Sequence, residues 1–516
     1  MSFLQQWCVR NLPVVTAVVA GAIWRLWLMG RYAGWEESDY GNLAMIQGVV
    51  EGGFRHFDMN HMPGYYGVSA LVHLVVNDAV VAGRSVSLVG GLVALGLSTR
   101  IAMRLGGRWC GWLVGLLLVV QPEFALYSSS SLREPLAGAF VLACVSLLIS
   151  ERMFLAGLFA GLAFLVRFDL ALVLTPVLVL HACGRPNWRQ RMFRGLFPLF
   201  LAVLLWSVYC RIDHGTFVFW SHSVSVNLET GLGAEAEAPG QWWSNGVSVA
   251  AGLLGWLLPW RIGWGVWFGL VAGLLFFVRG VLRVVWGHEE SRFSAFQRTH
   301  GIRRTVTWTC LLMLGLWAGI GFVGQHSPGH NLYWKWLCPI IPILIPVAVT
   351  GLLGWMNRAT RLVGPYASGT VVLVIVAQAV WSNLHETERQ RLLSEAWYRP
   401  QLELAQHIEA EIDSDVPMVL DNIPACWIRR TTTNRPMTSW FDVPVQSGDR
   451  MGFAKWLEAE QIQWVLWFRE DWTQAPRIAP FLADGGTWEM GSVRLVERER
   501  EDGYGWIWFE VLTPSQ

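Results

Sequence analysis

The N-terminal part of the chain combines a membrane-length apolar run with a cluster of acids. Residues 11–29 read NLPVVTAVVAGAIWRLWLM, and residues 36–40 read EESDY. The apolar run has the length that spans the hydrocarbon core of a bilayer. Ionisable groups held near membrane depth usually mark a substrate pathway or a catalytic site. We therefore predict that the carboxylates Glu36, Glu37 and Asp39 belong to the functional site.

The composition predicts a polytopic α-helical membrane protein. The chain has 516 residues, of which 53% are hydrophobic and 15% charged, and its mean hydropathy is +0.38. Apolar runs of about 20 residues recur along it. The formal net charge is +1 and no basic face is present, which argues against nucleic acid as a partner. No signal-peptide cleavage pattern follows the first run, so we expect that run to remain as a membrane anchor.

The distribution of arginines predicts how the spans are oriented. Arg10 precedes the first run, and basic clusters follow at residues 100–108, 152, 185–194, 279–304 and 358–361. Cytoplasmic loops carry an excess of Lys and Arg, so these clusters and the N-terminus are expected in the cytoplasm. The loops 30–84, 128–134, 212–245 and 324–336, and everything after about residue 383, then lie outside.

This orientation predicts about eleven spans in an integral plasma (inner) membrane protein, with a margin of two. Two apolar stretches, residues 64–83 and 246–260, must not cross fully, or the basic clusters would change sides. Half-crossing backbone is tolerated only where protein or a water-filled cavity covers it. The two stretches therefore suggest a cavity on the outer side.

The composition changes after Trp381, and we divide the chain into a membrane domain, 1–383, and a small extracytoplasmic α/β domain, 384–516. Helices are predicted at residues 388–412 and 452–461, and strands at 416–421, 464–468, 493–497 and 505–511. Cys426 is the only cysteine clearly in this part, so no disulfide is expected there. The chain contains no His/Cys spacing typical of structural zinc.

The acidic segment has two readings. Glu36, Asp39 and Tyr40 share one face if the segment is helical, because positions i, i+3 and i+4 coincide. They would then point two carboxylates and a phenol toward one pocket. The alternative is a solvated helix N-terminus, where acids favour the helix dipole. His61 and Tyr65 follow in a polar and aromatic run, which ordinary interfacial residues explain better than a metal site.

Three further groups of outer residues also have alternative roles. Glu134 fits a capping box with Ser131, which would explain its presence without a separate catalytic role. An ion pair closing a tight turn explains Arg167 and Asp169 at least as well as substrate binding does. In the loop 324–336, which also holds His330, Lys335 could snorkel to the interface or hold a phosphate as a point charge.

In their order, these motifs resemble the C-type (GT-C) glycosyltransferases of the protein mannosyltransferase and lipid A aminoarabinose transferase type. The matching segments are residues 36–48, His61-Met-Pro63-Gly-Tyr65, residues 84–90, Pro122 with residues 129–135, residues 161–169 and residues 333–339. The chain departs from the family at Glu36, where Asp is usual, and at Lys335-Trp336, where Arg-Tyr is usual. Each motif is loose, and the specificity lies in their order.

The resemblance implies a GT-C-like fold and an enzyme that transfers a sugar on the outer face of the membrane. The donor would be a sugar linked through phosphate to a polyprenol, and the acceptor a hydroxyl of a glycolipid, a glycan or a protein. One of the three acids, Glu36, Glu37 or Asp39, would be the general base. The resemblance leaves the need for a divalent cation open. The residues expected to contact substrate are Tyr40, His61, Tyr65, Glu134, Arg167, Asp169, His330 and Lys335.

Two other classes share part of this pattern. In a transporter or flippase of a lipid-linked glycan, Glu36, Glu134 and Arg167 would be relay groups, but the inverted repeats that favour this class are not found in the sequence. A glycan polymerase or ligase would share the carrier chemistry and differ in the acceptor. The oligosaccharyltransferase branch is disfavoured, because its Trp-Trp-Asp signature is missing and Trp242-Trp243 is followed by Ser244.

Overall fold

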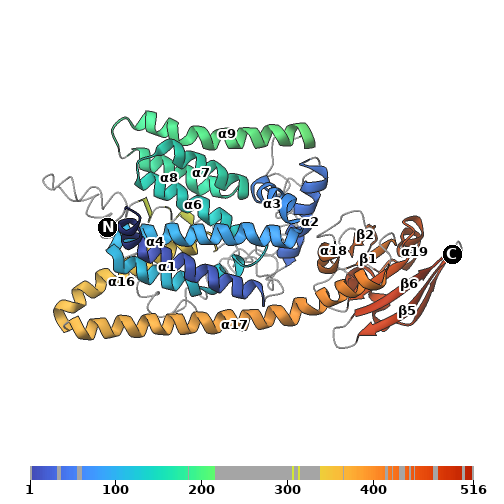
Figure 1. Ribbon diagram of the computed structural model, residues 1–516. Helices are drawn as coiled ribbons and strands as arrows, with labels where there is room; N and C mark the ends of the chain where they lie inside the picture. The colour runs from blue at the N-terminus through green and yellow to red at the C-terminus, as the bar shows by residue number, and fades with distance from the viewer. Residues whose placement is uncertain are drawn as a thin grey trace, which may run out of the picture. The chain divides into compact units, whose positions relative to one another are not determined.

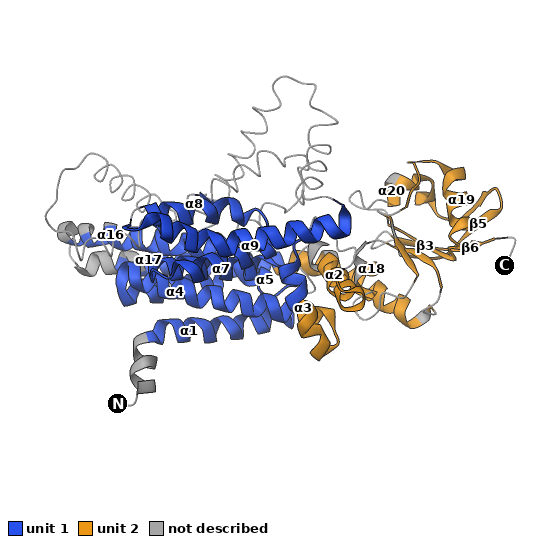
Figure 2. Ribbon diagram, turned by 90° about the horizontal axis from the view of Figure 1, so that it is seen from above, with its two compact units in different colours: residues 1–31, 54–68, 84–390 blue, residues 32–53, 69–83, 391–516 orange. Residues whose placement is uncertain are grey.

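The computed structural model divides the chain into two compact units (Figure 2), which are described separately. The helical unit comprises residues 1–31, 54–68 and 84–390, and the sheet unit comprises residues 32–53, 69–83 and 391–516. The structure describes residues 3–31, 37–54, 61–183, 185–215, a few residues between 305 and 313, and residues 338–513 with gaps at 364, 413–415, 421, 429–435, 441–442, 447, 469–474 and 502–505.

The helical unit is built from apolar helices (Figure 1). They are α1 (Phe3–Met29), α4 (Ala79–Val120), α5 (Pro122–Tyr127), α6 (Glu134–Ile149), α7 (Met153–Val166), α8 (Leu170–Cys183), α9 (Trp188–His214), α16 (Ile341–Val363) and the first part of α17 (Pro365–Glu411). Among the described residues, three helical segments are long and apolar enough to cross a membrane, namely Asn11–Met29, Ala79–Val120 and Trp188–His214. Five shorter apolar helices accompany them within these described ranges. The chain is thus mostly helical, and the count of eleven spans stays a prediction.

Helix α4 folds back on itself at Gly107. This residue has φ +81° and ψ −174°, which interrupts the helix. A methyl group added at Gly115 would lie 3.4 Å from the Thr99 hydroxyl oxygen. In a straight helix these two residues would be about 24 Å apart. Two arms therefore pack side by side, which confirms that the predicted runs 85–104 and 109–127 are separate, with the turn at residues 105–108.

The stretch 64–83, predicted to cross only partly, is not one helix. Helix α3 (Pro63–Val76) has 14 residues, and Asn77 follows with φ +52°. Fourteen residues rise about 21 Å, less than the roughly 30 Å of a hydrocarbon core. Helices α7 and α8 have the same length, so the length alone does not separate a partial from a full crossing. The second such stretch, 246–260, lies outside the described residues.

Helices α7 and α9 approach each other through glycines. A methyl group at Gly157 would overlap the carbonyl oxygen of Gly195, and one at Gly161 would lie 3.2 Å from the carbonyl oxygen of Pro198. Glycines spaced four apart allow two backbones to come this close in a membrane. The packing of α7 on α9 is therefore fixed by the absence of side chains at these positions.

The sheet unit contains a six-stranded sheet in the order β2-β1-β3-β6-β5-β4. The strands are β1 (Met418–Leu420), β2 (Met437–Ser439), β3 (Trp464–Phe468), β4 (Thr487–Met490), β5 (Val493–Glu501) and β6 (Trp506–Leu512). Strand β1 is parallel to β2 and β3, and the other pairs are antiparallel.

Both faces of this sheet are covered, because successive side chains of a strand point to opposite faces. On β3, Val465 and Trp467 join a core with Phe453 of α19 (Arg450–Ala459). Leu466 and Phe468 join a second core, which includes Leu404 and Ile408 of α17 and Ile428 of α18 (Asn422–Ile428). The indole N–H of Trp467 donates to the Ala479 carbonyl at 3.0 Å, which satisfies a polar group inside the first core.

The elements predicted after residue 412 are confirmed in part. Strands β1, β3, β5 and β6 and helix α19 stand where the pattern placed them, whereas the predicted helix 388–412 is the end of the longer α17. Helix α18, the short helical turns α20 (Ala475–Ile478) and η2 (Pro480–Asp484), and strands β2 and β4 were not predicted. Helix α2 (Glu37–Gly52), from the N-terminal part of the chain, belongs to the sheet unit.

Candidate functional site

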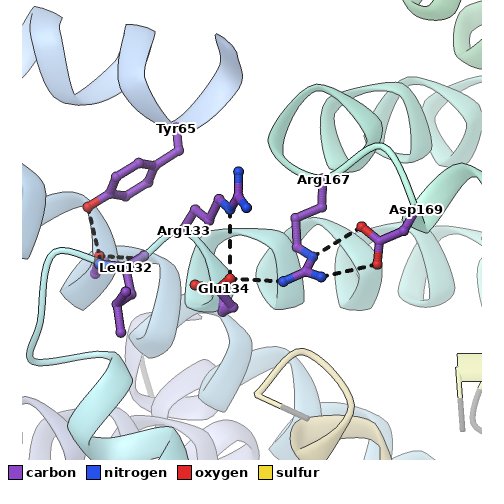
Figure 3. A network of polar contacts seen from close by, with 7 residues as sticks. Tyr65, Leu132, Arg133, Glu134, Arg167 and Asp169 are labelled. Atoms are coloured by element: carbon purple, nitrogen blue, oxygen red, sulfur yellow. Dashed lines mark hydrogen bonds and ion pairs between the residues drawn. The ribbon is translucent and has the colours of Figure 1, made fainter. Parts of the chain in front are cut away.

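A buried group of charged side chains lies in the helical unit, where α6 begins and α7 meets α8 (Figure 3). The Arg167 guanidinium donates to Oε1 of Glu134 at 2.8 Å and, through two nitrogens, to the Asp169 carboxylate at 3.2 Å each. Arg133 lies 3.7 Å from the same Glu134 oxygen. The structure therefore brings together three of the residues predicted from separate motifs, and it shows the predicted ion pair across Phe168.

The opposite charges in this group are buried together and lie in direct contact. The Glu134, Arg167 and Asp169 side chains are 2%, 4% and 8% exposed. Burial alone would lower the pKa of Arg167, but the charges of Asp169 and Glu134 outweigh it and raise that pKa above its ordinary value. Oε2 of Glu134 is buried and has no hydrogen-bond partner among the described residues. A buried carboxylate oxygen of this kind is open to a further donor.

Tyr65 and Ser87 fix the loop that leads into Glu134. The Ser87 hydroxyl donates to the Leu132 carbonyl at 2.5 Å and accepts from the Leu132 amide at 3.1 Å. The Tyr65 hydroxyl lies 3.3 Å from the same Ser87 oxygen. All three residues are buried. The predicted residue Tyr65 thus contacts the site through one intermediate side chain.

The capping-box reading of Glu134 is wrong. Helix α6 begins at Glu134 itself, and the residue before it, Arg133, makes no side-chain hydrogen bond to the helix. Ser131 is therefore too far from the start of α6 to cap it. Pro135 follows directly and carries no amide hydrogen, so this helix start has one donor fewer to satisfy. Glu134 is held by Arg167 instead.

The end of the predicted late basic-aromatic-proline element reaches the same region. A methyl group added at Gly138 of α6 would lie 3.3 Å from the Cα of Pro339. The Cys338 thiol is fully buried within electrostatic range of Glu134 and Arg167. Lys335, which belongs to the same element, and His330, which precedes it in the loop 324–336, lie outside the described residues.

The acidic segment forms the start of helix α2 in the sheet unit. Glu37 is the first helical residue and Asp39 lies in the first turn, where the helix dipole favours acids. Glu36 lies outside the described residues, as do the side chains of Glu37 and Asp39. Tyr40 is only 1% exposed, and its ring lies 5.5 Å from the ring of Tyr398 and 6.4 Å from that of Trp427.

His61 is described, and its ring contacts aromatic side chains of the helical unit. Its ring meets the ring of Tyr66 edge-on at 5.7 Å, and Tyr66 meets Tyr65 in the same manner at 5.4 Å. His61 is therefore connected by ring contacts to the Tyr65, Ser87 and Leu132 network. No three His, Cys, Asp or Glu side chains gather as a metal site in the described part of the chain.

Three contributors to this region were not singled out from the sequence. Ser87 and Gly90 lie within a motif that was quoted, but their contacts cross to residues far along the chain. A methyl group at Gly90 would lie 2.7 Å from the backbone of Leu136. Arg25 was hidden within the first apolar run. It is fully buried and lies 4.9 Å from the Phe124 ring centroid, and two of its nitrogens have no hydrogen-bond partner within the part of the chain that the structure describes.

Solved structures share this fold, whereas no family model and no curated protein matches the chain. ArnT from Cupriavidus metallidurans, a lipid A aminoarabinose transferase, matches in the apo state with a TM-score of 0.57 and 14% identity, over 99% of this chain and 98% of that one. The same protein bound to undecaprenyl phosphate matches with a TM-score of 0.57 and 12% identity, over 98% of each chain.

A more distant likeness is to the Archaeoglobus fulgidus oligosaccharyltransferase tethered to an acceptor peptide. It has a TM-score of 0.50 and 10% identity, over 89% of this chain and 69% of that one. Both neighbours are GT-C glycosyltransferases. The chain therefore has the GT-C fold, as its motifs predicted.

Proposed function

We propose that this chain is a membrane glycosyltransferase that moves a sugar from a polyprenyl-phosphate donor to an acceptor hydroxyl on the outer face of the membrane. One observation carries the proposal, namely the shared fold along nearly the whole of this chain and of ArnT, which has been crystallised with undecaprenyl phosphate. The order of the sequence motifs supports it independently.

The acceptor's proton would pass to a carboxylate of the acidic segment, Glu36, Glu37 or Asp39. A positioned general base of this kind typically contributes on the order of 10²–10⁴ in rate. The carbon that loses the phosphate would gain the acceptor oxygen, so the reaction inverts that centre. The base has to lie on the face opposite the leaving phosphate, which is consistent with placing the acids and Lys335 in separate loops.

Lys335 would hold the donor's phosphate, and Arg167 would not compete for this role. The Arg167 guanidinium already lies between two carboxylates, Glu134 and Asp169. A cation neutralised in this way offers an incoming phosphate less attraction than a cation without such partners does. We assign Glu134, Arg167 and Asp169 to the wall of the donor site, which they keep rigid.

Mass spectrometry of envelope glycolipids and glycoproteins tests the function. Cells with and without the chain, and cells carrying a Glu36→Gln, Glu37→Gln, Asp39→Asn triple variant, are compared at equal amounts of folded protein. A sugar that disappears in the deletion and in the variant supports the proposal. Transfer at the wild-type level in the triple variant would exclude the acidic segment as the base.

A second experiment, with purified protein in vesicles that contain donor and acceptor, separates a transferase from a flippase. A flippase would leave every glycosidic bond to other enzymes, so purified protein in vesicles would form no new product from the donor. A transferase forms product in that preparation. The formation of product from the donor therefore decides between the two classes.

A further inference from the structure

Helix α2, which begins with the acidic segment, forms part of the sheet unit rather than of the helical unit. It packs against α18, and its buried side chains Tyr40, Leu43 and Ile46 are each at most 2% exposed. The polypeptide that carries the candidate base is thereby held by residues that follow Gln390 in the chain. None of these later residues belongs to a motif quoted for the GT-C resemblance.

Two aromatic side chains contact Tyr40, the residue that follows Asp39. The Tyr40 ring lies 5.5 Å from that of Tyr398 in α17, at an interplanar angle of 45°, and 6.4 Å from that of Trp427 in α18, at 60°. Both distances fall within the range in which aromatic rings attract each other in tilted arrangements. Tyr40 directly follows Asp39, in the first turn of α2.

We infer that Tyr398 and Trp427 are positioning residues, which set the placement of the acidic first turn of α2 through Tyr40. Within a helix, residues one turn apart are rigidly connected, with a rise of about 5.4 Å per turn. A shift of the Tyr40 ring is therefore transmitted to Glu37 and Asp39. The inference rests on the proposed function, because the placement of these acids matters only if one of them is the base.

A displacement of about 1 Å at a reacting group can cost on the order of 10²-fold in rate. We accordingly expect Trp427→Leu and Tyr398→Leu to lower product formation per folded protein by at least about tenfold. Tyr398→Phe and Trp427→Phe keep a ring at each position and are expected to retain most of the activity. The matched control is Trp456→Leu, which removes an equally large, half-buried ring that stacks on Phe453 in the same unit but away from α2.

The position of α2 is measured directly with spin labels in the full-length protein. One label is placed at Gly48→Cys, an exposed position on α2 where a side chain meets no other atom. The other is placed at Met451→Cys on α19, which is 51% exposed. Native cysteines that react with the label are replaced by serine. Distances between the labels are compared in the parent, Trp427→Leu, Tyr398→Leu and Trp456→Leu proteins.

We expect the leucine variants at 427 and 398 to shift or broaden the distance distribution, and Trp456→Leu to leave it unchanged. An unchanged distribution in both variants would overturn the inference. The inference would also be overturned if the distribution shifts while product formation stays at the wild-type level, provided that the triple acid variant is inactive. If the triple variant stays active, the proposed base itself is wrong, so the two failures are distinguishable. If one leucine variant does not fold, the other still gives the answer.

Discussion

Arg167 is the residue on which the buried charges of the helical unit depend. It stands between Glu134, 33 positions earlier, and Asp169, two positions later. A buried ion pair is a modest source of stability, because dehydrating the charges offsets most of their attraction. Removing one partner is a different matter, since the others are left buried without compensation. Arg167 therefore compensates the charge of two buried carboxylates at once.

Arg167→Met is expected to destabilise the folded protein by about 3–5 kcal/mol, because Glu134 and Asp169 lose their buried partner. Thermal or denaturant unfolding in detergent measures this. Replacing the whole group by Glu134→Leu, Arg167→Met and Asp169→Leu should recover most of the loss. Arg399→Met is the control, since it breaks the exposed pair with Glu395, which is worth at most about 1 kcal/mol. Equal costs for the two single variants would contradict the prediction.

Lys335 offers a second test at the scale of one residue. Lys335→Met is expected to weaken donor use strongly. The defect should ease as donor concentration rises, because the proposed role of Lys335 is to bind the ground state of the donor. Lys335→Arg should keep substantial activity, although its fork geometry differs from a point charge. Transfer rates measured against donor concentration check both. A donor dependence unchanged by Lys335→Met would mean that this lysine only snorkels to the interface.

At the scale of elements, the patterns that could be read from sequence were those with a strong local signal. The hairpin of α4 was predicted from two apolar runs separated by arginines, and β3 from the run Trp464–Phe468. Strand β2 has three residues and β4 has four. Both are too short for an alternation of apolar and polar residues to be recognised in the sequence. The error at Glu134 has a related cause, because S-x-x-E marks a helix start only when Ser is the cap, and here α6 starts three residues later.

Contacts between distant elements could not be read from the sequence at all. The pairing of Glu134 with Arg167, the Ser87 contacts to Leu132 and the association of α2 with α18 join segments whose proximity no local pattern encodes. The resemblance to a family supplied the grouping of Glu134, Arg167 and Asp169 in one site. It did not supply Tyr398 or Trp427, because neither stands in a shared motif.

The packing of α7 on α9 gives a test at this scale. Gly157→Ala is expected to destabilise the protein by about 1–3 kcal/mol, because the added methyl group meets the backbone of Gly195, which cannot move aside. Gly161→Ala is the matched control on the same helix face, where the nearest atoms lie at 3.1 Å and 3.2 Å. Its steric cost is largely offset by the gain in helix propensity. Unfolding of both variants in detergent should therefore separate them, and equal stabilities would show that the helices adjust.

For the molecule as a whole, the orientation predicted from arginines is open to a labelling experiment. A cysteine at Met451 in the sheet unit should react with a membrane-impermeant maleimide in intact cells. The native Cys183 is exposed in the structure and lies beside the basic cluster 185–194, so it should react only after permeabilisation. The reverse pattern would place the sheet unit in the cytoplasm and remove it from any outer-face reaction.

The sheet unit combines segments from both ends of the chain, and this affects the order in which the protein is assembled. Helix α2 is synthesised early, but its contacts in α17 and α18 come after Gln390, more than 300 residues later. At about 5–20 residues per second, a ribosome needs roughly 15–70 s to produce them. During that time helix α2 lacks its contacts with α17 and α18, while the apolar helices between are being inserted. A chain terminated before α18 would therefore carry the acidic segment on a helix that lacks this contact, and under the proposed function we expect such a chain to form no product.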